Sequence, residues 1–152
     1  MKNSRINLPT DKMPIIRIAP VCNGKIYVTP HFSEHQENGY LDLPIEEKVE
    51  HVSVKSDKII RKLKEKYHTH ISSSMTPRFS VQYQSEAHNG NTAYLYILPL
   101  KEENEIQFHE GKFITAEDIV NHPDRYGHNL QKESELLGMA AELWNDFHIE
   151  YP

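Results

Sequence analysis

The chain has 152 residues, a length typical of one domain with one hydrophobic core. Its formal net charge is −5 with histidine neutral, which argues against a nucleic-acid-binding protein that relies on a broad basic surface. Cys22 is the single cysteine, so an internal disulfide is excluded and a reducing compartment is favoured. No apolar run approaches the roughly 18 residues of a membrane span, and the first 14 residues lack the apolar stretch of a secretory signal. We therefore expect a soluble, cytoplasmic protein that forms one domain over residues 1–152, with residues 1–12 as a loose polar segment.

Apolar and alternating stretches predict six strands in this chain. The first five cover residues 13–21, 25–32, 40–44, 78–84 and 92–100, and the sixth is an extended stretch within residues 106–115. Asn23 and Gly24 predict a tight hairpin turn between the first two strands, because both residues tolerate positive φ. The polar stretch 33–39 predicts a loop, and the charged stretch 45–54 predicts a connection.

Three helices are predicted. Ser56 is a candidate N-cap for a helix over residues 57–67, whose apolar side chains share one face. Thr115 and Asp118 resemble a capping box that opens a short second helix. The last helix, over residues 130–147, is expected to bury Leu130, Leu137, Ala140, Ala141, Leu143, Trp144 and Phe147. The order β-β-β-α-β-β-β-α-α predicts the α/β (α+β) class, with a mixed sheet between the first helix and the two C-terminal helices.

This element order, with "GYLDLP" before a charged stretch and "RKLKEKYH" on the helix that follows, resembles the Nudix hydrolase family over residues 13–148. The resemblance implies an α/β/α sandwich and a strand-loop-helix motif, G-x5-E-x7-R-E-U-x-E-E-x-G-U, where U is apolar. In that family the motif glutamates bind Mg²⁺ or Mn²⁺, and the ions activate water and neutralise a diphosphate. "GKFITAEDI" is also similar to the family's late strand entering a short helix.

The motif is degenerate in this chain. When Arg61 is placed on the motif arginine, Leu63 and Glu65 also match. The two motif glycines fall on Glu47 and His68. The other three motif glutamates fall on Ser53, Lys62 and Lys66. The four acid positions of the motif, 53, 62, 65 and 66, therefore carry 0, +1, −1 and +1. Two unit charges about 4 Å apart interact by roughly 4 kcal/mol at an effective dielectric constant near 20. Because the two lysines would repel a divalent cation, we expect no metal at this helix.

We therefore predict a Nudix-fold protein that has lost its metal-dependent pyrophosphohydrolase site and acts as a ligand-binding or protein-binding module. Arg61, Lys62, Glu65 and Lys66 are the candidate ligand-binding residues, because lysine nitrogens in the place of the ions can bind a phosphate-bearing small molecule. A simpler interpretation is that this helix face is solvated, with an ordinary stabilising pair between Arg61 and Glu65. A purely structural subunit is a further option, and the sequence leaves a homodimer open.

The alternative function is a divergent Nudix-type hydrolase of a nucleoside-diphosphate-linked substrate. Its catalytic acids would come from Glu46, Glu47, Glu50 and Glu65. Only in this case would Mg²⁺ or Mn²⁺ be a cofactor.

Histidines and tyrosines supply the other candidate residues. Zinc needs about four ligands, and the pairs His31 with His35 and His68 with His70 have no cysteine pair to complete a site, so solvated histidines are the simpler interpretation. Strand tyrosines could wall a pocket, although strand aromatics more often pack in cores or across strands. They are Tyr27, Tyr40, Tyr83, Tyr94 and Tyr96. Cys22 lacks the basic or helix N-terminal surroundings of a reactive thiolate.

Overall fold

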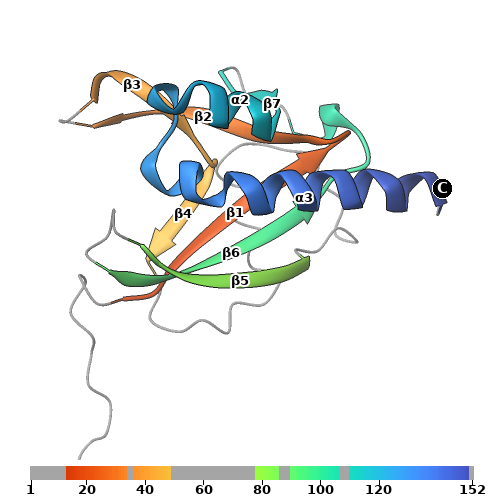
Figure 1. Ribbon diagram of the computed structural model, residues 1–152, viewed down its shortest axis with the longest axis horizontal. Helices are drawn as coiled ribbons and strands as arrows, with labels where there is room; N and C mark the ends of the chain where they lie inside the picture. Colours follow the sequence, from red (N-terminus) through yellow and green to blue (C-terminus); the bar gives the residue numbers. More distant parts are fainter. Residues whose placement is uncertain (1–12, 34–35, 49–77, 86–89, 107–109, 151–152) are drawn as a thin grey trace, which may run out of the picture.

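A computed structural model describes residues 13–33, 36–48, 78–85, 90–106 and 110–150 (Figure 1). The strands within these residues are β1 (Ile15–Cys22), β2 (Lys25–Ser33), β3 (Gln36–Asp42), β4 (Ile45–Lys48), β5 (Arg78–Ser85), β6 (Asn91–Pro99) and β7 (Lys112–Ile114). The helices are α2 (Ala116–Asn121) and α3 (His128–Glu150), with single 3-10 turns at Glu103–Glu105 and Pro123–Arg125.

The seven described strands form one mixed sheet. Its order is β3-β2-β1-β6-β5, with β4 paired to β1 and β7 paired to β2. The pair β1–β6 is parallel, and the other pairs are antiparallel. On the edge opposite β6, β1 pairs with two strands in turn. Ile15 to Ile18 pair with β4, and Val21 and Cys22 pair with β2. The predicted mixed sheet and α+β class are confirmed.

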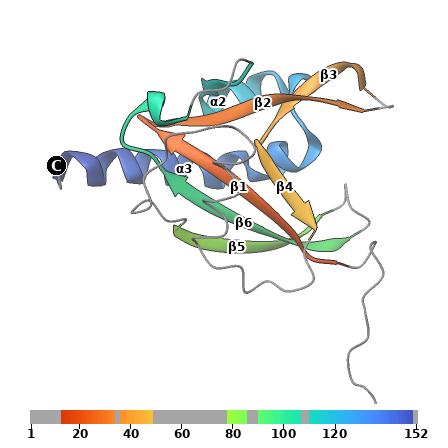
Figure 2. The same ribbon diagram turned by 180° about the vertical axis from the view of Figure 1, so that it is seen from behind.

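Helices α2 and α3 lie on one face of the sheet: in Figure 1, α3 crosses in front of β1 and α2 lies in front of β2, and in Figure 2 both helices are behind the sheet. Successive side chains of β1 alternate between the two faces. Ala19 packs in a buried cluster with Leu130 and Leu137 of α3, whereas Ile16 and Ile18 belong to a second buried cluster. All eight residues of β1 are buried, so both faces of this strand are shielded from water. The helix expected at 57–67 lies outside the described residues.

Two local sequence signals form as predicted. Asn23 and Gly24 have φ values of 53° and 75°, and they connect the paired residues Cys22 and Lys25 in a two-residue hairpin. The Thr115 side chain accepts a hydrogen bond from the Asp118 backbone N–H at 3.1 Å and caps α2. Both features depend on neighbours in the chain, which explains why the sequence predicts them.

Two predicted boundaries differ from the structure. The stretch 33–39 predicts a loop, but β3 begins at Gln36, and the irregular pairing between His31 and Ser33 accommodates Gly39 with φ 80°. The stretch 45–54 predicts a connection, but β4 begins at Ile45. Its backbone pairs with β1, Lys48 is exposed, and the partly exposed Glu46 side chain reaches Arg17. The extended stretch predicted within residues 106–115 is present as β7, and the described residues 106 and 110 form bends.

Helix α3 is longer than predicted and buries most of the predicted line of side chains. Leu130, Leu137, Ala140 and Ala141 are in the core. Leu143 is 50% exposed, contrary to prediction, because it lies about 200° around the helix from Ala141. The side chains of Trp144 and Phe147 lie outside the described part. Among the helices that the structure describes, none combines the length and apolarity needed to cross a membrane.

Candidate functional site

The predicted site residues divide into those that the structure describes and those that it does not. Outside the described residues lie Glu50, Ser53, Arg61, Lys62, Glu65 and Lys66. Glu46 and Glu47 are neighbours in β4, so their side chains point to opposite faces of the sheet. Glu46 bonds to Arg17, and Glu47 pairs in register with Ile16. The strand geometry therefore does not favour one ion shared by Glu46 and Glu47.

A buried ionic cluster surrounds Arg17 on the face of β1 that α3 covers. Arg17 is only 1% exposed. Its Nε and Nη2 donate to the two carboxylate oxygens of Glu133 at 2.8 and 2.7 Å. Nη2 also donates to Asp42 Oδ1, and Nη1 donates to Glu46 Oε1, each at 2.7 Å. The Tyr83 hydroxyl donates to Glu133 Oε2 at 2.6 Å. We name these five residues the Arg17 cluster, in which β1, β3, β4, β5 and α3 meet at one guanidinium.

Burial and charge act against each other in the Arg17 cluster. Burial by itself would lower the pKa of Arg17, but the carboxylates of Glu133 and Asp42 outweigh it and hold that pKa well above its ordinary value. Burial raises the pKa of Glu133, against the charge and hydrogen bonds of Arg17 and the hydrogen bond from Tyr83. Burial and the Glu133 charge also raise the pKa of Tyr83. At neutral pH, Arg17 is therefore charged and the Tyr83 hydroxyl keeps its proton.

Two sequence signals for this cluster were present and were missed. Arg17 interrupts an otherwise apolar strand, "IIRIAPV". Glu133 lies three residues after Leu130 and four before Leu137, on the helix line that faces the core. A charged side chain at a core position needs a partner in a folded protein, so the two together indicate a buried ion pair. No comparable pattern points to Asp42, which the tertiary structure alone brings to Arg17.

The segment before α3 docks on β3 and holds this end of the cluster in place. Tyr126 forms an isolated bridge with Leu41, and the Gly127 backbone N–H donates to the Leu41 carbonyl at 2.9 Å. A Cβ atom at Gly127 would overlap the carboxylate of Asp42. Glycine at this position therefore permits the close approach of α3 to the strand that carries Asp42.

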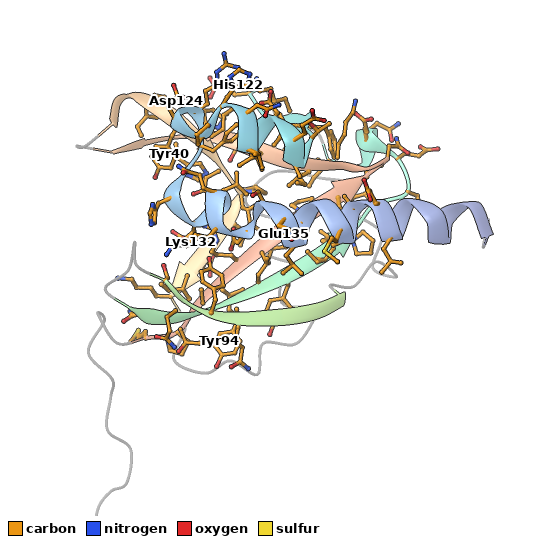
Figure 3. The ribbon with its side chains drawn as sticks, in the orientation of Figure 1. Tyr40, Tyr94, His122, Asp124, Lys132 and Glu135 are labelled. Carbon is orange, nitrogen blue, oxygen red and sulfur yellow. The ribbon has the colours of Figure 1, made fainter. Side chains whose placement is uncertain are left out.

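An aromatic pair, His31 and Tyr40, lies near the start of α3. Their ring centroids are 5.6 Å apart with an interplanar angle of 21°, and Figure 3 shows Tyr40 at the end of the molecule where α3 begins. His31 Nε2 lies within hydrogen-bond distance of the Thr29 hydroxyl (3.2 Å) and the Leu43 carbonyl (3.0 Å). Within the described part of the chain, no group of three His, Cys, Asp or Glu side chains is arranged to hold a metal ion. The other histidines of the zinc hypothesis, His35, His68 and His70, lie outside it.

Most of the strand tyrosines pack in the protein interior. Tyr27 is buried and meets the Phe113 ring edge-on at 5.0 Å. Tyr96 packs against the second apolar cluster, and Tyr94 is half-buried. Cys22 is also buried in that cluster. These positions favour packing over a binding surface for the tyrosines and do not suit a reactive cysteine.

The structure resembles solved Nudix structures, whereas the sequence matches no protein-family model and no curated protein. A MutT NUDIX hydrolase from Burkholderia pseudomallei has a TM-score of 0.52 and 17% identity over 81% of this chain and 95% of its own. An ADP-ribose pyrophosphatase from Streptococcus suis has a TM-score of 0.54 and 16% identity over 87% and 91%. The Ap4A hydrolase of C. elegans has a TM-score of 0.52 and 16% identity over 86% and 98%. Since a shared fold does not fix an activity, these likenesses establish the architecture: the chain has the Nudix fold.

Proposed function

We propose that this protein binds a phosphate-bearing small molecule on the Nudix fold, without the metal-dependent hydrolysis of the family. The observation that carries the proposal is the replacement of motif glutamates by lysine, together with the engagement of Glu46 by Arg17. Lys62 and Lys66 stand at two positions where the motif has glutamate. Glu46, an alternative acid on β4, is already bonded to the buried Arg17 at 2.7 Å.

The described residues do not fit a Mg²⁺ or Mn²⁺ site. A hard divalent cation needs several oxygen ligands with net negative charge. Asp42, Glu46 and Glu133 have such oxygens, but all three accept hydrogen bonds from Arg17. A second cation among them would be repelled by the guanidinium and would have to displace its bonds. The proposal therefore involves no metal-dependent step.

The class of ligand follows from the lysines and from the names of similar structures. An ammonium group is a compact cation that binds phosphate oxygens through charge-assisted hydrogen bonds. Two of the similar structures are named for ADP-ribose and Ap4A, so these compounds are the first probes to test. A protein partner that binds the segment with Lys62 and Lys66 is the other form of binding role.

Thermal unfolding in EDTA tests the proposal directly. A ligand that binds only the native state raises its stability by about 2.7 kcal/mol at one hundred times its dissociation constant. We expect ADP-ribose to raise the unfolding temperature of the unmodified protein, and the double variant Lys62→Glu, Lys66→Glu to lose that shift.

A charge-matched control is Lys25→Glu with Lys112→Glu, two exposed lysines on β2 and β7, which should retain the shift. Inorganic phosphate serves as the third probe, after ADP-ribose and Ap4A. No shift with any of the three probes, or an equal shift in both double variants, would contradict the proposal.

The divergent hydrolase is the second candidate, because the similar structures are named hydrolases and pyrophosphatases. Calorimetry that finds a micromolar Mg²⁺ site abolished by Glu65→Gln would favour it. The triple variant Ser53→Glu, Lys62→Glu, Lys66→Glu restores the acid set beside Glu65. We expect this variant to bind divalent metal before it hydrolyses substrate, since hydrolysis also needs a placed water. If the unmodified protein hydrolyses ADP-ribose with Mg²⁺ at a rate that the triple variant leaves unchanged, catalysis uses other residues and the lost-site hypothesis is wrong.

A further inference from the structure

Exposed apolar side chains gather on the two described helices. Among the residues that the structure describes, four large apolar side chains are exposed, and three of them belong to α2 and α3. Val120 of α2 and Met139 of α3 are each 64% exposed, and Leu143 of α3 is 50% exposed. A single exposed apolar residue is ordinary, whereas several on one surface indicate an interaction site.

Helical spacing places the apolar residues of α3 on one line. Leu136, Met139 and Leu143 follow each other at intervals of three and four residues, so they lie along the same side of the helix. Leu136 is half-buried and packs against the buried cluster of Leu130 and Leu137, and it forms the inner edge of this apolar line. Apolar residues at these intervals form the seam against which a second helix packs.

Helix α2 extends this surface to the side of α3. A Cβ atom at Gly138 would lie 2.9 Å from the Cβ atom of Ala116, so the two helices approach closely where α3 has no side chain. Val120 follows Ala116 by four residues and therefore lies on the same side of α2, one turn along. We name Val120 and the apolar line the α2–α3 surface; both helices lie in front of the sheet in Figure 1.

The charge of α3 is negative. Residues 128–150 contain five acidic residues, one lysine and no arginine. Glu135 and Glu142 are exposed and lie two helical turns apart, so they share one side of the helix, and each directly precedes a residue of the apolar line. Lys132 lies near the beginning of the helix (Figure 3). A positively charged partner therefore complements this helix and the formal net charge of −5 of the whole chain.

We propose that the α2–α3 surface binds a basic amphipathic helix of a partner protein. The apolar face of that helix covers Met139 and Leu143, as amphipathic helices do when they bind along an apolar surface. Its lysine or arginine side chains lie beside Glu135 and Glu142, where they form charge-assisted hydrogen bonds. The inference does not rest on the proposed function, because it uses none of the residues 61–66.

A second copy of this chain fits the α2–α3 surface less well. Antiparallel pairing of α3 with itself around Met139 brings Glu135 of one copy close to Glu142 of the other, twice in each dimer, and like charges across an interface disfavour association. Parallel pairing places Lys132, which precedes Met139 by seven residues, against its own counterpart. The three exposed apolar side chains also form a small patch, whereas permanent homodimers bury large apolar interfaces.

Two synthetic peptides test the proposal on the full-length protein. The first has leucine at positions i, i+3, i+4 and i+7 of a helix and lysine at the flanking positions, and the second has glutamate in place of every lysine. In fluorescence anisotropy of labelled peptides, we expect the lysine peptide to bind and the glutamate peptide not to bind. In nitrogen-15 NMR spectra, the lysine peptide should shift the backbone amides of Val120, Met139 and Leu143 most.

Variants of the protein separate the apolar contribution from the charged one. Met139→Lys should weaken binding of the lysine peptide at least about tenfold, the effect of a typical anchor residue. Glu135→Lys with Glu142→Lys should weaken it to a similar extent and increase the affinity for the glutamate peptide. Glu103→Lys with Glu110→Lys is the charge-matched control, which changes two exposed glutamates outside both helices and should retain the affinity.

Four results would overturn the proposal. They are no binding of the lysine peptide, equal binding of the two peptides, an equal loss of affinity in both double variants, and NMR shifts that leave α3 unchanged. Sedimentation of the protein alone tests the second copy. We expect a monomer, whereas a dimer that Met139→Lys dissociates would assign the α2–α3 surface to self-association and would also overturn the proposal.

Discussion

Removal of the Arg17 charge is the most direct test of how this fold is held together. Arg17→Met retains a long side chain but leaves Glu133 and Asp42 buried without their counter-charge. Breaking a buried ion pair by removing one partner costs about 3–5 kcal/mol. For a protein of this size, that loss lowers the unfolding temperature by roughly 6–20 °C. It is a large part of the typical total stability of about 5–15 kcal/mol.

The measurement is urea denaturation followed by far-ultraviolet circular dichroism, with the free energy of unfolding taken from linear extrapolation. The double variant Arg17→Met, Glu133→Met should recover most of the loss, because apolar replacement of a whole buried pair is often neutral or stabilising. Lys25→Met changes an exposed lysine and should stay within about 0.5 kcal/mol of the unmodified protein. The reasoning is refuted if Arg17→Met costs less than about 1 kcal/mol, or if the double variant is as unstable as the two single variants added together.

The same assay checks three further expectations. Gly127→Ala adds a methyl group that overlaps the Asp42 carboxylate and should cost about 1–3 kcal/mol; an unchanged midpoint would mean that the segment before α3 shifts freely. Tyr83→Phe removes the 2.6 Å hydrogen bond to the buried Glu133 and should cost about 1–3 kcal/mol, so a neutral result would show that the carboxylate finds another donor. Thr115→Ala removes the side-chain cap of α2 and should cost about 1 kcal/mol, whereas Thr115→Asp, which can still cap, should cost less.

Local features of this protein are determined by the sequence itself. The Asn23-Gly24 turn and the Thr115 cap form as predicted because a positive φ and a capping oxygen act on residues next to them in the chain. The line of Leu130 and Leu137 along α3 follows from helical periodicity alone. The order of the elements also indicates the Nudix fold. The similar solved structures confirm this fold, although the sequence matches no family model.

Tertiary structure alone decided what the charged residues near the expected site do. Charged residues at 46–48 are typical of a loop when considered locally, yet the backbone pairs with β1 and brings Glu46 to Arg17 across the strand pair. Asp42 and Glu133 are 91 positions apart in the sequence, but share one nitrogen of that guanidinium. Periodicity reveals which side of an element faces the core, whereas the partner of a buried charge depends on which elements pack together. The packing of α3 and β4 around β1 therefore decides that these acids form a salt-bridged cluster with Arg17.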